Sequence, residues 1–167
     1  MKAHIFPVVV IAAVLILGWS AWPQIRGWMI KEQVATPKQS GGYGQADVSF
    51  SEVTVTATIP LTAELQAQGL GSRPGLGDRD GMLWLYNQPD FYSFWMKNMM
   101  FPLDFIWING NEVIDVTPNV KPPTSTNESE LSVYRPKRPA SAILEVAAGF
   151  ADHFHIQAGD MVTIDRK

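Results

Sequence analysis

The pattern of apolar and polar residues divides the chain into an uncharged N-terminal run, a polar segment and a longer region of alternating positions. Residues 5–22 contain no charged residue and begin with the sequence IFPVVVIAAVLILG. As a helix, a run of this length would extend about 27 Å, close to the roughly 30 Å hydrocarbon core of a bilayer. Tryptophans at positions 19, 22 and 28 suit the aromatic belt of a membrane interface. We therefore predict a membrane anchor within residues 1–30, or, as the alternative, a cleaved signal peptide.

The segment after the apolar run is polar and contains glycine. Residues 31–47 read KEQVATPKQSGGYGQAD without apolar periodicity, so they are predicted to form a flexible linker to a globular domain of residues 48–167. The short N-terminal tail and leader-like order favour a domain on the extracytoplasmic side. The count of Lys and Arg on either side of the run does not favour this orientation. We expect a periplasmic or cell-surface domain attached to the membrane through residues 5–22.

Alternating apolar positions predict β-strands at the start of the globular domain. Apolar residues alternate with polar ones at 48–50 and again at 53–59, but the phase slips by one residue between the two stretches. This pattern predicts either one strand with a bulge or two short strands. Thr62 is a suitable cap for a short helix at 62–70, and the glycines at 69–81 predict a loop.

The later elements are predicted from aromatic-rich or apolar runs that turn residues separate. Residues 87–90, Asn-Gln-Pro-Asp, predict a turn between two aromatic-rich strands. We expect strands at 82–86, 91–96, 143–146 and 161–164, a long proline-containing connection at 117–140 and a short helix at 149–155.

The clearest local pattern is that of a β-hairpin. Asn109-Gly110 stands between two apolar runs, as is typical of a two-residue hairpin loop. With that loop, Asp104 would face Asp115 on the partner strand. Successive residues at 105–108 point to opposite faces and all are apolar, so both faces should be covered by protein. The expected fold is mostly β with a minor helical part: a compact β-sandwich or barrel-like domain with one or two short helices, behind an N-terminal transmembrane helix.

Composition narrows the possible chemistry. The chain has no Cys, which excludes disulfides, thiolate metal sites and Cys nucleophiles. Its net charge of -3 provides no electrostatic footprint for nucleic acid, so no nucleic-acid partner is expected. His153 and His155 would not share one face of the predicted helix, and no third ligand stands near them. We therefore expect no metal and no cofactor.

A series of short motifs carries a family resemblance. In order along the chain they are Gly69-Leu70 with Arg73, Gly81-Met82-Leu83, Phe94-Trp95-Met96-Lys97-Asn98, Pro102-Leu103-Asp104, Leu144-Glu145-Val146 with Gly149, and Gly159-Asp160. Over about residues 50–165 the chain resembles the domain of unknown function 192 family. The resemblance implies a compact, mostly β fold with one or two short helices, often behind a leader or anchor, and no established reaction. The chain departs from the family at Gly71, where Met usually follows Gly-Leu.

The residues at the centre of the family motif are candidates for binding. Lys97 offers three hydrogen-bond donors, and Asn98 offers a donor and an acceptor. Beside the aromatic Trp95, they could hold a carboxylate, a phosphate or a sugar hydroxyl. The alternative is a structural pair, in which Asn98 forms a turn and Lys97 faces solvent.

Two acidic residues stand in apolar strands. Asp104 lies between Leu103 and Phe105, and Glu145 is flanked in the same way. Buried carboxylates are almost always paired, and either Arg73 or Lys97 could neutralise them. They would form either an ion-paired core network or a polar pocket with perturbed acids. For Asp104 the structural interpretation is favoured. The candidate binding residues are Arg73, Trp95, Lys97, Asn98, Asp104 and Glu145, and no catalytic residue is assigned.

We predict a non-enzymatic ligand-binding or interaction module at the membrane surface, whose ligand is small and polar or glycan-like. One alternative is a hydrolase of envelope glycan or peptide, in which Asp104, Asp115 or Glu145 supplies acid and base. It requires two of these carboxylates on one solvent cavity. The other alternative is a structural partner in a membrane-protein complex, which would dock through the basic residues near the end of the 117–140 connection.

Overall fold

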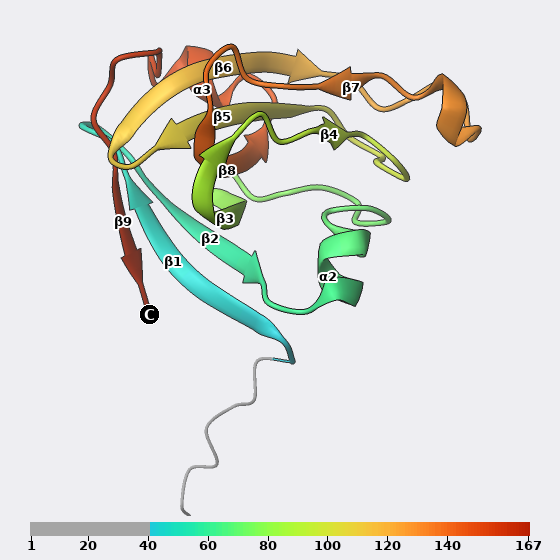
Figure 1. Ribbon diagram of the computed structural model, residues 1–167, viewed down its shortest axis with the longest axis horizontal. Coiled ribbons are helices and arrows are strands. Elements are labelled where there is room, and N and C mark those ends of the chain that lie inside the picture. Colours follow the sequence, from blue (N-terminus) through green and yellow to red (C-terminus); the bar gives the residue numbers. More distant parts are fainter. Residues whose placement is uncertain (1–40) are drawn as a thin grey trace, which may run out of the picture. The chain divides into compact units, whose positions relative to one another are not determined.

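The computed structural model describes residues 41–167, in which one curled seven-stranded sheet dominates (Figure 1). In chain order the strands are β1 (Tyr43–Ser49), β2 (Thr54–Pro60), β3 (Asp80–Asp90), β4 (Phe94–Trp95), β5 (Leu103–Asn109), β6 (Glu112–Val120), β7 (Val133–Tyr134), β8 (Ala140–Ala147) and β9 (Thr163–Arg166). The helical elements are α2 (Ala63–Gln68), the 3-10 turn η1 (Glu128–Glu130) and α3 (Phe150–His153).

The predicted anchor and most of the predicted linker lie outside the described residues. Among the helices of residues 41–167, none combines the length and apolar character that crossing a bilayer requires. Strand β1 begins at Tyr43, so the last five residues of the predicted linker belong to the sheet.

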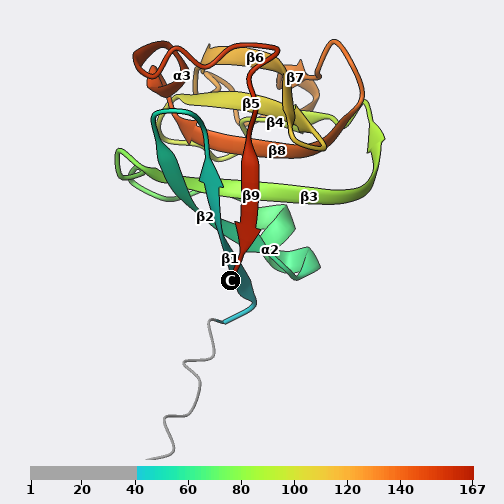
Figure 2. The same ribbon diagram turned by 90° about the vertical axis from the view of Figure 1, so that its left-hand side faces the viewer.

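The strand order in the large sheet is β6-β5-β8-β3-β2-β1-β9. Neighbouring strands are antiparallel except β2 and β3, which are parallel and joined by a crossover that contains α2. Strands β4 and β7 form a separate two-stranded ribbon. Figure 2 shows β9 lying beside β1, at one edge of the sheet.

Hydrogen bonds join the two edges of the sheet at one end and make it a half-barrel. The edge strands are β6 and β9, and an isolated antiparallel bridge links Glu112 with Met161 just before β9. Val113 N donates to Asp160 O at 2.9 Å, and Val162 N donates to Asn111 O at 2.9 Å. The prediction of a mostly β, barrel-like domain with two short helices is therefore confirmed, and the transmembrane helix stays a prediction.

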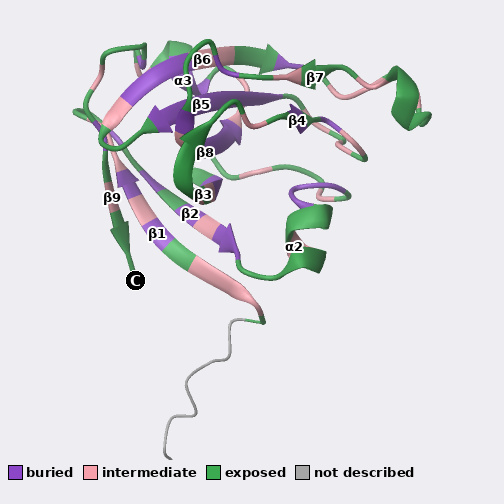
Figure 3. Cartoon of the chain, viewed as in Figure 1, coloured by how far each residue is buried: buried purple, intermediate pink, exposed green. Residues whose placement is uncertain are grey.

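Apolar side chains cover both faces of the sheet, as predicted for the hairpin. Every residue from Leu103 to Ile108 is buried, and β5 and β8 are buried along most of their length (Figure 3). Ile106, Ile108 and Leu144 belong to one apolar cluster. Phe105 and Trp107 belong to the second, on the opposite face.

The hairpin register differs from the predicted one. The loop consists of Gly110 and Asn111, one residue later than expected, and Gly110 adopts a φ of 62°. A bulge then places one extra β6 residue beside β5, so Trp107 pairs with Asp115. The prediction that Asp104 faces Asp115 is wrong, because the loop shift and the bulge move β6 along its partner.

Other local predictions have mixed outcomes. The phase slip after residue 50 corresponds to two strands, β1 and β2, which pair as an antiparallel hairpin. Thr62 caps α2, since its hydroxyl accepts a hydrogen bond from Leu65 N at 3.3 Å. The predicted turn at 87–90 is wrong, because β3 continues through Asp90, where it pairs again with β8 after an irregularity.

Candidate functional site

The candidate site is a cavity of about 170 Å³ on the side of the sheet that carries the β4–β7 ribbon and α2. The C-terminal half of α2 and the loop after it form one wall. Side chains from β3, β4, β8 and the segment after β4 complete it. The side chains that matter most for its chemistry are Trp84, Tyr86, Trp95, Lys97 and Glu145.

Local geometry holds the loop after α2 in this position. Gly69 ends the helix with a φ of 53°, and its N–H donates to Leu65 O at 2.9 Å. The next residue, Leu70, is 1% exposed and anchors the loop in the second apolar cluster. A Cβ on Gly71 would lie 2.9 Å from Gln68 O, so a side chain does not fit there without a shift. The departure from the family at this position thus suits the close approach of the backbone.

Glu145 is the buried polar group of the cavity. It pairs across the sheet with Phe105 in β5 and Met82 in β3, and it is 5% exposed. Its Oε2 and the indole Nε1 of Trp84 are both buried without a hydrogen-bond partner among the described residues. Burial raises the pKa of Glu145 to about 7, although the neighbouring Trp84 indole opposes this rise. The indole N–H and the carboxylate are thus near enough to interact, but neither atom has a partner at full hydrogen-bond geometry, and both residues line the same cavity.

Aromatic rings from β3 form a second part of the cavity. Trp84 and Tyr86 are two residues apart in the strand, so both point to the face on which Glu145 lies. Trp84 packs edge-on against Phe94, with ring centres 5.1 Å apart. Tyr86 stacks on Tyr92 at 3.5 Å between ring centres. Burial raises the pKa of Tyr86 to about 12, with Tyr92 and Glu145 adding to the rise, so this phenol is neutral at physiological pH.

Lys97 and Trp95 lie at the rim of the cavity. The Lys97 Nζ forms an ion pair with Glu128 of η1 and lies 5.5 Å from the centre of the Trp95 ring. Trp95 is 45% exposed, so it presents aromatic surface to solvent. The structure thus places three of the predicted site residues, Trp95, Lys97 and Glu145, around one cavity.

Asn98 and Arg73 do not line this cavity. Asn98 has a φ of 58°, and its carbonyl accepts a hydrogen bond from Ser72 N at 3.0 Å, which ties the loop after α2 to the segment after β4. This backbone role is the turn function that the sequence left open for Asn98. The guanidinium of Arg73 lies 5.8 Å from the ring centre of Tyr43, in cation–π geometry.

Asp104 lies on the opposite face of the sheet and serves the fold. It is fully buried, and its two oxygens accept hydrogen bonds from Asn119 N at 2.7 Å and from Ala151 N at 2.9 Å. The first bond holds the β6 backbone beside β5. The second satisfies a free N–H in the first turn of α3. Neither Lys97 nor Arg73 forms an ion pair with it in the described part of the chain.

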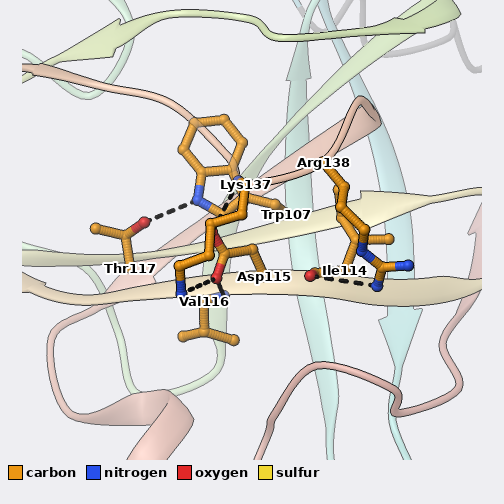
Figure 4. Close-up of polar contacts among 7 residues, drawn as sticks. All are labelled: Trp107, Ile114, Asp115, Val116, Thr117, Lys137 and Arg138. Carbon is orange, nitrogen blue, oxygen red and sulfur yellow. Dashed lines mark hydrogen bonds and ion pairs between the residues drawn. The ribbon is translucent and has the colours of Figure 1, made fainter.

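Asp115 also acts through backbone contacts (Figure 4). Its carboxylate accepts hydrogen bonds from Val116 N at 3.0 Å, from Lys137 N at 3.1 Å and from Lys137 Nζ at 3.2 Å. The neighbouring Arg138 donates to Ile114 O at 3.4 Å. Two of the basic residues considered for docking thus hold the segment before β8 against β6.

The three carboxylates considered for hydrolysis do not meet. Glu145 lines the cavity beside α2, Asp104 is sealed on the other face, and Asp115 lies at a separate surface hollow with His155. Glycoside hydrolysis by paired carboxylates needs both groups on one cavity. Within residues 41–167 no three His, Asp or Glu side chains lie close enough to hold a metal ion.

Sequence reasoning missed the contributions of Trp84 and Tyr86. The two aromatic residues stand at alternate positions of one strand, which places them on one face. That spacing could have indicated an aromatic wall. It could not have indicated which residues lie opposite, because Glu145 is about sixty residues further along the chain.

The sequence profile of the DUF192 family, described as "Uncharacterized ACR", matches residues 46–164. The chain belongs to the DUF192 family. The match extends from β1 to β9 and includes every residue of the cavity. No curated protein matches this chain.

Two crystal structures share the fold of this DUF192 domain. A protein of unknown function from Novosphingobium aromaticivorans DSM 12444 is 31% identical, with a TM-score of 0.60, over 72% of this chain and 84% of that one. A protein from Sinorhizobium meliloti 1021, described as a candidate transcription regulator, is 21% identical, with a TM-score of 0.62, over 73% of this chain and 93% of that one. At 21% identity the second likeness concerns the fold alone.

Proposed function

We propose that this DUF192 domain is a non-enzymatic binding module that holds a small polar ligand in the cavity at Glu145. The observation that carries the proposal is the pair of buried, unpartnered atoms, Glu145 Oε2 and Trp84 Nε1, at one cavity. Buried polar atoms in native proteins are almost always hydrogen-bonded, and leaving one unpaired costs about 1–3 kcal/mol. A ligand with a donor and an acceptor would satisfy both atoms.

The shape and lining of the cavity support a small ligand. Its volume of about 170 Å³ is below the roughly 300–1,000 Å³ of sites for drug-sized molecules. One ring, or the terminal group of a longer molecule, would fill it. The aromatic walls suit the apolar face of such a ring, while the exposed Trp95 could contact any part that extends beyond the rim.

The proposal of binding rather than catalysis rests on what lines the cavity. Among the described lining residues, Glu145 is the one carboxylate and Lys97 the one cation. Lys97 is engaged with Glu128 and Trp95. General acid–base hydrolysis by a carboxylate pair would need a second acid there.

We also propose that residues 5–22 attach this module to a membrane, with the domain on the extracytoplasmic side. The support is the uncharged apolar run and its leader-like position. Protease added to intact spheroplasts would then degrade the domain. A domain that is protected until the cells are lysed would contradict this orientation.

Ligand binding can be tested with the full chain in mild detergent. Monosaccharides, amino sugars, polyols and amino acids would be added one at a time while two-dimensional NMR follows the indole N–H of Trp84. Trp84→Phe assigns this resonance and removes the donor while keeping an aromatic ring. The indole of Trp107 is an internal reference, because its N–H already donates to Thr117 Oγ1 at 2.9 Å in the core.

We expect at least one compound class to shift the Trp84 resonance and leave that of Trp107 unchanged. Trp84→Phe removes the indole donor, and Glu145→Gln replaces one carboxylate oxygen, an acceptor, with an NH₂ donor, so each should weaken binding about tenfold. Asp165→Asn is the matched control, because it makes the same kind of change on the exposed strand β9. The proposal fails if no compound shifts Trp84 at millimolar concentration, or if both cavity variants bind as tightly as the control.

A further inference from the structure

The cavity contains a buried carboxyl group but lacks a cation to pair with it. Glu145 forms no ion pair in the described part of the chain. The wall from Gln66 to Gly71, which is the end of α2 and the loop after it, has no charged side chain. Lys97 is held at the rim by Glu128 and by the Trp95 ring. A buried carboxyl group is normally either paired or neutral, so a positive group bound in this cavity would stabilise the ionised form of Glu145.

We propose that the ligand of this cavity carries a protonated primary amine, which binds against the Glu145 carboxylate between the aromatic walls. The proposal rests on the binding function proposed above and names its ligand class. An ammonium group has three donors, so it can bond Glu145 and still reach other acceptors. The resulting hydrogen bond would be charge-assisted, which makes it stronger than one between neutral groups.

The aromatic walls suit the same ligand. The rings of Trp84, Tyr86 and Trp95 line the cavity, and the face of an aromatic ring attracts a cation. The rim already contains one example, since the Lys97 ammonium lies 5.5 Å from the centre of the Trp95 ring. Among the described residues that line the cavity, Lys97 is the one charged group besides Glu145. Tyr86 keeps its proton because burial raises its pKa to about 12.

A neutral hydroxyl ligand is the alternative, and pH separates the two. Burial raises the pKa of Glu145 to about 7, so the carboxyl group goes from mostly protonated to mostly ionised as the pH rises through that value. An aliphatic amine stays protonated over this range, since its pKa is near that of lysine. Amine binding should therefore tighten about tenfold from pH 6 to pH 8. A hydroxyl ligand needs no ionised carboxylate and should not show this increase.

The test uses two compounds of the same size and ring. trans-4-Aminocyclohexanol carries the amine, and cyclohexane-1,4-diol replaces it with a hydroxyl. Both are titrated into the full chain by calorimetry at pH 6, 7 and 8. We expect the amine to bind at least about tenfold more tightly than the diol at pH 8, and the difference to diminish at pH 6.

The variant Glu145→Gln keeps the size of the side chain and removes its charge. It should abolish both the preference for the amine and the pH dependence, while Asp165→Asn retains both. If Glu145→Gln does not fold, the pH series on the unmodified chain still decides the matter. Equal binding of amine and diol at pH 8, or amine binding that does not change with pH, would overturn the amine proposal.

The two proposals fail in different ways. If neutral compounds of the wider panel bind and the amine does not, the amine proposal is wrong and the binding function stands. If no compound of either kind binds at any pH, both proposals are wrong.

Discussion

At the scale of single residues, the two buried acids have opposite surroundings. Asp104 lies on one face of the sheet, where each of its carboxylate oxygens accepts a hydrogen bond from a backbone N–H. Glu145 lies on the other face with an unpartnered oxygen, among the described residues, at a cavity. Both stand between apolar neighbours in the sequence. The two acids therefore differ in the hydrogen-bond donors around them in the folded chain and not in their neighbours in the sequence.

The structural role of Asp104 leads to a prediction. Asp104→Asn keeps the shape but turns one acceptor oxygen into an NH₂ group, which leaves a buried backbone N–H without its acceptor. We expect the free energy of unfolding to decrease by about 2–3 kcal/mol. Urea denaturation of the full chain, followed by the near-ultraviolet signal of the core tryptophans, would measure this decrease.

Ligand binding is the control for that variant. Because Asp104 points away from the cavity, the folded Asp104→Asn protein should bind any ligand of Glu145 as tightly as the unmodified chain. Unchanged stability together with lost binding would show that Asp104 belongs to the site instead.

At the scale of elements, the cavity depends on how the α2 crossover meets β4. The hydrogen bond from Ser72 N to Asn98 O joins the loop after α2 to the segment after β4. Gly71 allows the approach, because a Cβ there would lie 2.9 Å from Gln68 O and 3.5 Å from Lys97 O. The wall of the cavity beside α2 thus depends on a contact between two backbone segments, whereas aromatic side chains form its other walls.

Gly71→Ala should disturb this contact. The added methyl group must displace backbone, so we expect a loss of about 1–3 kcal/mol in unfolding free energy and weaker ligand binding. Gly75→Ala is the matched control in the same loop, since its Cβ would meet no atom within 4 Å. Thermal unfolding of the two variants measures the difference. Equal melting temperatures would mean that the loop yields without cost and that Gly71 does not shape the cavity.

At the scale of the whole molecule, the half-barrel of residues 41–167 has two apolar clusters and joined sheet edges. Joining the edges near Glu112 and Met161 leaves fewer backbone groups free to pair with another chain. The half-barrel therefore has the features of an independently folded domain. The predicted anchor would attach this domain to the membrane and would not contribute to its folding stability.

Deleting residues 1–30 tests this separation. We expect the shortened chain to leave the membrane fraction, because the uncharged apolar run is gone. Its unfolding temperature should match that of the full chain. Flotation on a density gradient and thermal unfolding are the two measurements. A shortened chain that still floats with membranes would contradict the anchor, and one that does not fold would contradict the independence of the domain.

The sequence by itself determined the class of the domain and several local elements. Alternation at period two predicted the first two strands, and apolar or aromatic runs between turn residues predicted later ones. Thr62 predicted the cap of α2, and the ordered motifs predicted the family. These features depend on neighbours within a few residues, so local pattern is enough. The same reasoning placed Trp95, Lys97 and Glu145 among six candidates, but it could not select them.

Only the tertiary structure decided which candidates lie together. A shifted loop and bulges between β5 and β6 set the register, so the expected pairing of Asp104 with Asp115 does not occur. The crossover between the parallel strands β2 and β3 places α2 and the loop after it beside β4. This arrangement forms the cavity that Glu145 and Trp84 line. Register and crossover geometry depend on packing between distant segments, and a one-residue slip reverses the face of every side chain. For that reason the cavity at Glu145 emerged only from the folded chain.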